Sequence, residues 1–259
     1  MRSALNRFIG PRRRFHAYGV GMLKSGTTSL AAMLSGTYHA RHEPDKLPLL
    51  RAIVAHQNGT LSNRKMASFI RRRDRALHLE MEASAFLGFV AGLLVREYPE
   101  ARFILTIRDC YSWLDSSFNH LLSRYVSPEQ MEFLHWWLKP ERYASGSHDR
   151  ALEQLGLFPL ECYLQTWADH NRLIMEKVPR DRLLVVRTDE ISRSIPRIAD
   201  FLGIPAQSIV TDRSHQYRAQ EKFDVLAKMD QGYLSEAIEQ ICSEVWAVAL
   251  HQAGDAGIP

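Results

Sequence analysis

Residues Phe15 to Leu34 read F-H-A-Y-G-V-G-M-L-K-S-G-T-T-S-L-A-A-M-L, and the rest of the chain is organised around them. The apolar run Phe15 to Val20 predicts a short buried strand. The glycine-bearing residues Gly21 to Gly26 predict a turn, and Thr27 to Leu34 predict the start of a helix. A turn between a strand and a helix leaves unpaired N–H groups at the positive end of the helix dipole. This arrangement predicts a site for an anion.

The side chains of the turn suit a phosphate. Gly26 allows close backbone approach. Lys24 adds a full positive charge, and hydroxyl donors come from Ser25, Thr27, Thr28 and Ser29. Lys24 precedes Gly26, whereas the G-x-x-x-x-G-K-[ST] phosphate loop has lysine after its last glycine, so the predicted cradle is shorter. The alternative, an ordinary glycine turn, is weaker because these six positions hold one lysine, one glycine and four hydroxyls.

The composition limits the kinds of function that the protein can have. The chain has 259 residues, 46% of them hydrophobic and 24% charged, which is typical of one globular α/β domain with a full core. The net charge of +4 suits an anionic ligand and is too small to indicate nucleic acid. The three cysteines are far apart and odd in number, which predicts neither a disulfide framework nor a metal site. No stretch approaches the roughly 20 apolar residues of a membrane span. A reducing, cytoplasmic location is expected.

Further strands and helices alternate along the chain. The predicted strands after the first are Gly36 to Arg41, Ala76 to Glu82, Ala101 to Ile107 and Arg182 to Thr188. The predicted helices are Asp45 to Asn58, Ser62 to Arg75, Ala85 to Glu97, Tyr111 to Arg124, Leu160 to Val178, Asp189 to Leu202 and Ser235 to Leu250. This alternation predicts a three-layer α/β fold, with a P-loop-like central parallel sheet and helices on both faces.

The chain divides into an arm and one domain. Residues 1–14 are expected to be a basic arm, with Arg12 to Arg14 in a solvated charge cluster, and residues 15–259 the domain. The aromatic-rich residues 126–159 predict a helical insertion or lid over the active site, although satellite core is an equal alternative. A solvated helix face is expected to carry Arg71, Arg72, Arg73 and Arg75.

The candidate site residues fall at strand ends. In parallel sheets ligands bind beyond the carboxyl ends of the strands. The glycine turn is therefore expected to meet Glu43, Glu82, Arg108 and Thr188 on one rim. Pro44 biases Glu43 towards an extended conformation. Ser116 lies eight residues after Arg108, two turns into the next helix, so the two side chains are suited to grip a second phosphate.

Two of these motifs resemble those of the sulfotransferases, which use 3′-phosphoadenosine-5′-phosphosulfate (PAPS). K-S-G-T-T is similar to their 5′-phosphosulfate loop, and the Arg108–Ser116 pair is similar to their 3′-phosphate motif. The stretch R-T-D-E-I…F-L-G-I-P, Arg187 to Pro205, looks like the late strand and helix of bacterial and carbohydrate sulfotransferases. The resemblance covers about residues 15–222. It implies PAPS as co-substrate without a required metal. It also implies a basic loop that closes over the nucleotide, with the candidates Arg213, His215, Arg218 and Lys222, of which Arg213 and Arg218 are assigned to nucleotide binding.

Two departures separate the chain from the cytosolic steroid and phenol enzymes. Those enzymes usually stack a tryptophan on adenine after K-S-G-T-T, where this chain has Ser29. They also use a histidine base where this chain has Glu80-Met81-Glu82. The resemblance is therefore to the bacterial and carbohydrate type, with a carboxylate base. Glu43 is the first choice, because H-E-P matches an E-P segment of the heparan-type enzymes. Glu82 is second, and His42 or His39 third. A carboxylate that merely caps or pairs with an arginine is the alternative for Glu43.

The resemblance implies transfer of a sulfuryl group to a hydroxyl or amine. Lys24 would neutralise charge on the leaving oxygen. Aromatic residues favour a flat or apolar acceptor, whereas a carboxylate base favours a sugar or glycolipid, so small-molecule, carbohydrate and lipid acceptors stay open. One alternative is a small-molecule or nucleotide kinase, with Asp109 or Asp189 holding the metal. Another is a non-catalytic nucleotide-binding protein of the same fold. A homodimer is also left open.

Overall fold

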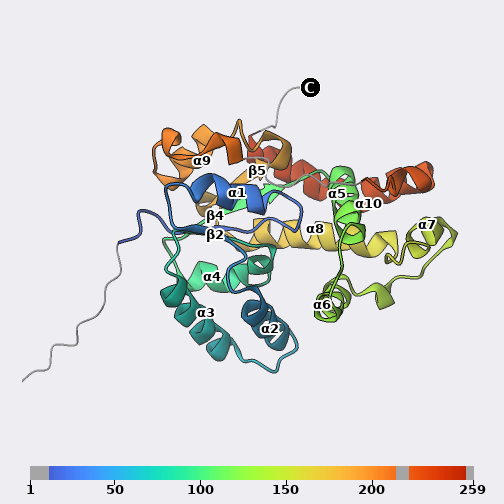
Figure 1. Cartoon of the computed structure of the whole chain (residues 1–259), viewed down its shortest axis with the longest axis horizontal. Coiled ribbons are helices and arrows are strands. Elements are labelled where there is room, and N and C mark those ends of the chain that lie inside the picture. The colour runs from blue at the N-terminus through green and yellow to red at the C-terminus, as the bar shows by residue number, and fades with distance from the viewer. Residues whose placement is uncertain (1–11, 214–221, 255–259) are drawn as a thin grey trace, which may run out of the picture.

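The computed structural model describes residues 12–213 and 222–254. Its centre is a five-stranded sheet in the order β2-β3-β1-β4-β5 (Figure 1). The strands are β1 (Ala17–Gly19), β2 (Ala40–His42), β3 (Met81–Ala83), β4 (Arg102–Ile107) and β5 (Leu183–Arg187). Every neighbouring pair is parallel, and Tyr18 of β1 lies opposite Glu82 of β3 and Phe103 of β4. The strand of the glycine turn is thus the middle strand, and the predicted parallel sheet is confirmed.

One face of the sheet is covered by α1 (Thr27–Leu34) and α9 (Ile195–Leu202), which lie together above it in Figure 1. Leu30 and Met33 of α1 and Ile198 of α9 are fully buried there against Ile104 of β4. Burying side chains of this size contributes about 1.5–3 kcal/mol each. This packing fixes the direction of α1 and hence of the turn before it.

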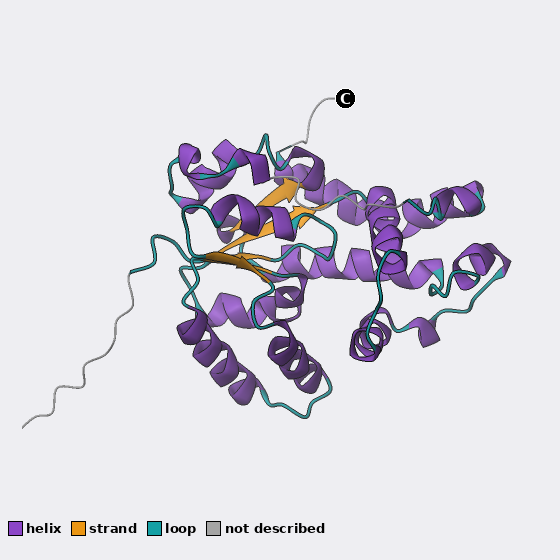
Figure 2. Cartoon of the chain, viewed as in Figure 1, coloured by secondary structure: helices purple, strands orange, loops and turns teal. Residues whose placement is uncertain are grey.

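Helices of the other face share a larger core. They are α2 (Lys46–Gln57), α3 (Asn63–Leu77), the 3-10 helix η1 (Ala85–Val90), α4 (Ala91–Glu97), α5 (Cys110–Leu122), α8 (Leu160–Lys177) and α10 (Gln231–Ala253). Phe103, Leu105 and Ile107 of β4 belong to this core, whereas Ile104 belongs to the other. That alternation is the two-residue period of a strand buried on both faces. Figure 2 shows helices on both sides of the sheet, which is the predicted three-layer fold.

The segment between α5 and α8 is helical. It contains α6 (Pro128–Leu138), the turns η2 (Pro140–Arg142) and η3 (Ser147–Asp149), and α7 (Arg150–Glu153). The side chain of Ser127 caps α6 in a capping box with Gln130. Phe89 of η1 lies 5.3 Å from Trp136 and 5.4 Å from Trp137 of α6, measured between ring centroids. The aromatic side chains of α6 thus pack against η1. A role for this segment as a lid stays a prediction.

Several element boundaries differ from expectation. The strand expected from Gly36 begins at Ala40, and the helix expected from Ala85 begins with the 3-10 helix η1. The strand expected from Ala76 begins at Met81, because α3 extends to Leu77. Its C-cap residue, His78, has the left-handed φ of 46°. The helix expected from Asp189 is a 3-10 turn, η5 (Thr188–Glu190), and α9 starts at Ile195, where Pro196 is tolerated in the first turn. The last helix starts at Gln231 because the Asp230 carboxylate caps its N–H groups. The remaining 3-10 turns are η4 (Arg180–Arg182), η6 (Ala206–Ser208), η7 (Thr211–Arg213) and η8 (Leu226–Lys228).

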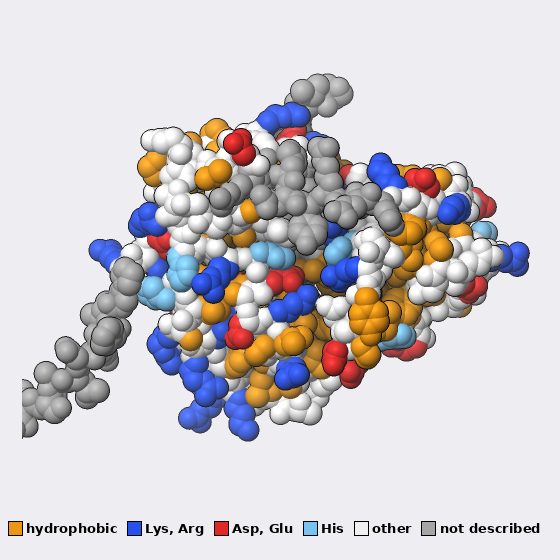
Figure 3. All heavy atoms as spheres, viewed as in Figure 1, with side chains coloured by type: hydrophobic (Ala, Val, Ile, Leu, Met, Phe, Trp, Pro, Cys, Tyr) orange, Lys and Arg blue, Asp and Glu red, His pale blue; other side chains and the backbone are white. Residues whose placement is uncertain are grey.

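At the described end of the basic arm, Arg12 and Arg14 are exposed as expected, but Arg13 and Arg14 form ion pairs. Arg13 contacts Asp74 at 2.7 Å, and Arg14 contacts Glu80 at 2.9 Å. Exposed arginines do gather over α3, where Figure 3 shows a cluster of positive side chains. Within residues 12–213 and 222–254, we find no helix with the length and apolar character that a bilayer crossing demands.

Candidate active site

The turn between β1 and α1 lies tightly over the end of β4. A Cβ atom on Gly21 would stand 2.1 Å from Thr106 Oγ1 and 2.5 Å from Ser25 Oγ, so a glycine is required there. Lys24 has φ 65° and Gly26 has φ 102°. Left-handed backbone is natural for glycine but strained for lysine. These two left-handed conformations turn the chain sharply just before α1.

Hydrogen bonds from three other elements hold the turn. Trp113 Nε1 of α5 donates to Leu23 O at 2.8 Å, and His170 Nε2 of α8 donates to Val20 O at 2.9 Å. The Thr188 hydroxyl lies 2.5 Å from Ser25 O. Contacts from α5, α8 and the residue that follows β5 thus hold the turn in place.

Ser25 does not present its hydroxyl as predicted. The residue is 2% exposed, and Ser25 Oγ donates to Met22 O at 2.7 Å. It also lies 3.2 Å from Thr106 Oγ1. Its hydroxyl therefore makes its contacts inside the protein, with the turn and with β4, and is already paired before any ligand binds.

A cavity of about 540 Å³ opens beyond the carboxyl ends of the strands. It brings together predicted residues that are scattered in sequence, namely Lys24, Gly26, Thr27, Thr28, Ser29, His42, Glu43, Arg108, Ser116, Thr188 and Asp189. It also contains Lys46, His120 and Arg124, which the sequence reasoning missed. Ser116 and His120 are four residues apart on α5 and so share one helix face. That spacing was the available signal for His120.

The cavity is positively charged. Four cationic side chains line it, Lys24, Lys46, Arg108 and Arg124, against two carboxylates, Glu43 and Asp189. Burial lowers the pKa of Lys24, and the charges of Arg108 and Arg124 lower it further. Burial also lowers the pKa of Arg108, while neighbouring aspartates oppose the shift. Crowded cations of this kind favour binding of an anion, which would relieve their repulsion.

The N-terminus of α1 adds to this field. Gly26 is the N-cap, and no side chain caps the helix there. First-turn N–H groups lack partners within a helix and carry the positive end of its dipole. Burial lowers the pKa of His42, and its Nε2 lies 3.2 Å from Thr27 Oγ1 and 3.3 Å from Thr28 Oγ1. A neutral imidazole thus orients two of the hydroxyls.

Glu43 reaches the cavity by an unexpected backbone route. Its φ is 45° and that of Asp45 is 55°, so the extended conformation expected before Pro44 is wrong. The Glu43 N–H continues the sheet by donating to Ala83 O at 3.0 Å, after which the chain reverses into α2. Glu43 Oε2 lies 3.1 Å from Lys46 Nζ. Among the described residues, Glu43 Oε1 is buried and accepts no hydrogen bond.

Glu82 lies outside the cavity. It is 5% exposed, and its Oε2 accepts from Arg73 Nη1 at 2.5 Å. Arg73 is 7% exposed, so the solvated position expected for it is wrong, and its Nη2 donates to Pro44 O at 2.5 Å. Burial raises the pKa of Glu82, and Arg73 opposes this shift. The pair supports the turn that carries Glu43, and Glu82 is not placed to accept a proton from a bound ligand.

The further candidates are His39, Arg213, Lys222 and the pair outside the described residues, Arg218 and His215. His39 is exposed, with Nδ1 3.1 Å from His78 O. Arg213 ends η7, and Lys222 is exposed. Arg218 and His215 lie outside the described residues.

The two aspartates considered as metal ligands have other contacts. Asp109 Oδ1 accepts the Ser112 N–H at 2.9 Å and so caps α5. Asp189 Oδ2 lies 2.6 Å from Arg187 Nη2. In the part of the chain that the structure describes, no three His, Cys, Asp or Glu side chains form a group suited to a metal ion.

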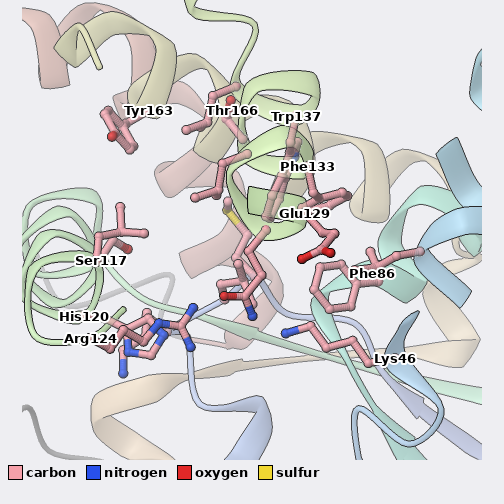
Figure 4. Close-up of a pocket in the computed structure, with 18 of the residues that line it drawn as sticks. Lys46, Phe86, Ser117, His120, Arg124, Glu129, Phe133, Trp137, Tyr163 and Thr166 are labelled. Atoms are coloured by element: carbon pink, nitrogen blue, oxygen red, sulfur yellow. The ribbon is translucent and has the colours of Figure 1, made fainter. Parts of the chain in front are cut away.

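A second, narrower cavity of about 90 Å³ adjoins the first. Leu23, Lys24, Lys46, His120 and Arg124 line both. The narrower cavity extends from this junction between α5, η1, α6 and α8 (Figure 4). Burial, together with Arg124 and Lys24, lowers the pKa of His120 to about 4, so its imidazole is neutral near pH 7.

Comparisons with known proteins show the family of the chain. Among solved structures, the chain is similar to a sulfotransferase from Alicyclobacillus acidocaldarius, with 16% identity, a TM-score of 0.45, and coverage of 93% of this chain and 94% of that one. It is also similar to the sulfotransferase domain of the Synechococcus PCC 7002 olefin synthase, with 16% identity, a TM-score of 0.47, and coverage of 94% and 95%. No curated protein sequence matches the chain. The family model described as a sulfotransferase domain matches residues 18–211. The chain therefore belongs to the sulfotransferase family.

Proposed function

We propose that the protein transfers the sulfuryl group of PAPS to an acceptor hydroxyl. The observation that carries the proposal is one cavity lined by two sets of groups suited to anions. Lys24 and the N-terminus of α1 form one set, and Arg108 with Ser116 forms the other. PAPS carries anionic groups at both its 5′ and 3′ positions, which suits two such sets. A cavity of about 540 Å³ is within the usual range for a ligand of nucleotide size.

The proposed step is an in-line displacement. The acceptor oxygen forms a bond to sulfur while the bond from sulfur to the 5′-phosphate oxygen breaks, and the bisphosphate leaves with the electron pair. Lys24 neutralises the charge that develops on that leaving oxygen, helped by the first N–H groups of α1. As in phosphoryl transfer, positioning and charge stabilisation supply most of the catalysis.

We assign the base to Glu43, which takes the acceptor proton. Glu43 lines the larger cavity and keeps one buried oxygen without a hydrogen-bond donor among the described residues. His120 is the competing base, because it lines both cavities and its lowered pKa leaves a nitrogen able to accept a proton.

Lys24→Ala tests the leaving-group role. Turnover of PAPS should fall by about 10²–10³-fold, since one charge-stabilising group is lost. The dissociation constant of adenosine 3′,5′-bisphosphate should rise much less, because Arg108, Ser116 and α1 remain. Calorimetry and a radiolabelled transfer assay measure the two effects. The exposed Lys65→Ala on α3 is the matched control.

Undiminished turnover in Lys24→Ala would show that Lys24 does not stabilise the leaving group. Binding of ATP with Mg²⁺ in place of the bisphosphate would favour a kinase.

Glu43→Gln and His120→Asn separate the two bases. Glu43→Gln keeps the shape of the side chain but cannot take the proton, so transfer should fall by about 10²-fold or more with bisphosphate affinity near normal. His120→Asn should retain most of the activity. The reverse ranking of the two variants in kcat would move the base to His120.

A further inference from the structure

We infer that the acceptor is a compact apolar molecule of the phenol class, bound in the narrower cavity with its hydroxyl at the junction. This inference rests on the proposed function and names the acceptor. The reaction is the balanced step given above, with the phenol oxygen bonding to sulfur and its proton passing to Glu43.

The wall of the narrower cavity is mostly carbon and rich in rings. Phe86 comes from η1, Trp113 from α5, Phe133 and Trp137 from α6, and Tyr163 from α8. Figure 4 shows Phe86, Phe133 and Trp137 grouped on one side, with Ser117 across from them on α5. Aromatic rings contact one another favourably face-to-edge or offset. A flat ring is therefore the acceptor shape that this wall fits best.

Several polar groups of the wall already have partners inside the protein. The Gln130 side chain accepts from the Ser127 N–H at 3.3 Å, and the Tyr163 hydroxyl accepts from the Phe158 N–H at 3.3 Å. Ser117 Oγ differs from these two, because it is buried without a partner among the described residues. A sugar would bring many hydroxyls to this wall, and buried polar groups without partners are costly. An acceptor with an apolar body and at most one further polar atom suits it.

The two cavities meet where transfer has to occur. Lys24, Lys46 and His120 line both of them. Adjacent serines of α5 divide between them, with Ser116 lining the larger cavity and Ser117 the narrower one. A phenol in the narrower cavity therefore has its hydroxyl beside Lys24. The volume of about 90 Å³ favours a single ring over a fused ring system or an oligosaccharide.

The outer surface near this cavity is apolar as well. Leu47 of α2 lines the cavity and is 52% exposed. Figure 3 shows a band of apolar side chains on this face, between the positions of α2 and α6 in Figure 1. Exposed apolar patches commonly mark binding sites, and this one offers an entry path for an apolar molecule.

The test uses 4-ethylphenol as the probe and glucose as its polar counterpart. Calorimetry first measures adenosine 3′,5′-bisphosphate binding to the whole chain. The second titration adds each probe to the bisphosphate complex, and a transfer assay with PAPS follows. We expect 4-ethylphenol to bind the complex and to be sulfated, with kcat/KM at least about 10²-fold above that for glucose.

Two variants fill the cavity from opposite walls. Leu134→Trp adds a ring from α6, and Ser117→Leu adds volume from α5 at a hydroxyl that has no partner to lose. Each should raise the KM for 4-ethylphenol by about tenfold or more while the bisphosphate dissociation constant stays within about twofold. Retained bisphosphate binding shows that a variant is folded. If one of the two variants does not fold, the other still tests whether the phenol binds in the narrower cavity.

The outcomes separate the two proposals. Failure of the wild-type chain to bind the bisphosphate overturns the proposed function, and the acceptor inference falls with it. Bisphosphate binding without 4-ethylphenol binding, or preferential sulfation of glucose, overturns the acceptor inference alone. Unchanged KM values in both filling variants would also overturn it, because the phenol would then bind elsewhere.

Discussion

At the residue scale, two turns beside the cavity contain strained backbone. Lys24, Glu43 and Asp45 have positive φ values, although none is glycine. Each such residue costs on the order of 1–3 kcal/mol and persists when its surroundings hold it. Here Trp113 and Thr188 hold the first turn, and the Arg73–Glu82 pair holds the second. The two strained turns carry Lys24 and Glu43, so a lysine and a carboxylate from separate turns line the same cavity.

Gly21→Ala should lower the free energy of unfolding by about 1–3 kcal/mol and weaken bisphosphate binding, because its Cβ would collide with Thr106 and Ser25. Gly92→Ala is the matched control. A Cβ there meets nothing nearer than Lys177 Cδ at 3.9 Å, so alanine should stabilise α4 by about 0.5–1 kcal/mol. Urea unfolding and calorimetry measure both variants. A Gly21→Ala protein as stable as the wild type would contradict the close approach.

At the element scale, α5 and α8 support the site together. The α5 helix begins at its Asp109 cap and carries Ser116, Ser117 and His120 along the wall between the cavities. From α8, Trp167 Nε1 donates to Arg108 O at 3.1 Å and His170 Nε2 to Val20 O. The α8 helix thus positions the chain just after two strands, while α5 supplies side chains to both cavities.

His170 should make stability depend on pH. Burial lowers its pKa from 6.5 to about 4, so between these values the unfolded chain takes up a proton that the folded chain does not. The free energy of unfolding should therefore fall as the pH drops from about 6.5 to about 4, by up to about 3 kcal/mol from this group. His170→Gln, which cannot titrate, should lose less stability across that window. Urea unfolding at several pH values compares the two proteins, and equal losses would contradict the prediction.

At the scale of the whole molecule, ion pairs join the beginning of the described chain to the sheet. Glu80, just before β3, accepts from the Arg14 N–H, from Arg14 Nε and from the His39 N–H, each at 2.9 Å. This one carboxylate connects the N-terminal segment, the approach to β2 and the approach to β3. The cationic cavity lies at the carboxyl ends of the same strands. One end of the sheet is therefore held by the contacts of Glu80, and the other end lines the cavity.

Glu80 should support the fold except in strong acid. Burial alone would raise its pKa, but the bonds from Arg14 and His39 outweigh that effect and lower it from 4.5 to about 2. The stabilisation is present above about pH 4.5 and should be lost as the pH falls towards 2. Glu80→Gln should be less stable than the wild type at pH 7, and the difference should shrink towards pH 2. Thermal unfolding across this range measures it, and a difference that is constant with pH would contradict the assignment.

The strength of the local pattern decided which predictions from sequence were correct. The strand Ala101 to Ile107 and the helix Leu160 to Val178 came within a residue of the observed β4 and α8, because long periodic apolar runs define their own faces. Boundaries went wrong where a cap or a proline acts, as at Asp230 and Pro196. A role for residues 126–159 as an insertion stays a prediction.

By itself, the sequence determined the strand–turn–helix, the alternation of strands and helices, and the strand ends on which Lys24, Glu43 and Arg108 lie. These are local properties, set by side-chain period and turn chemistry over a few residues. The tertiary structure alone decided that Ser25 and Glu82 point away from the cavity, that Arg73 is buried, and that His120 lies between two cavities. Those outcomes depend on strand order and on helix packing between residues far apart in the chain, which no local pattern encodes.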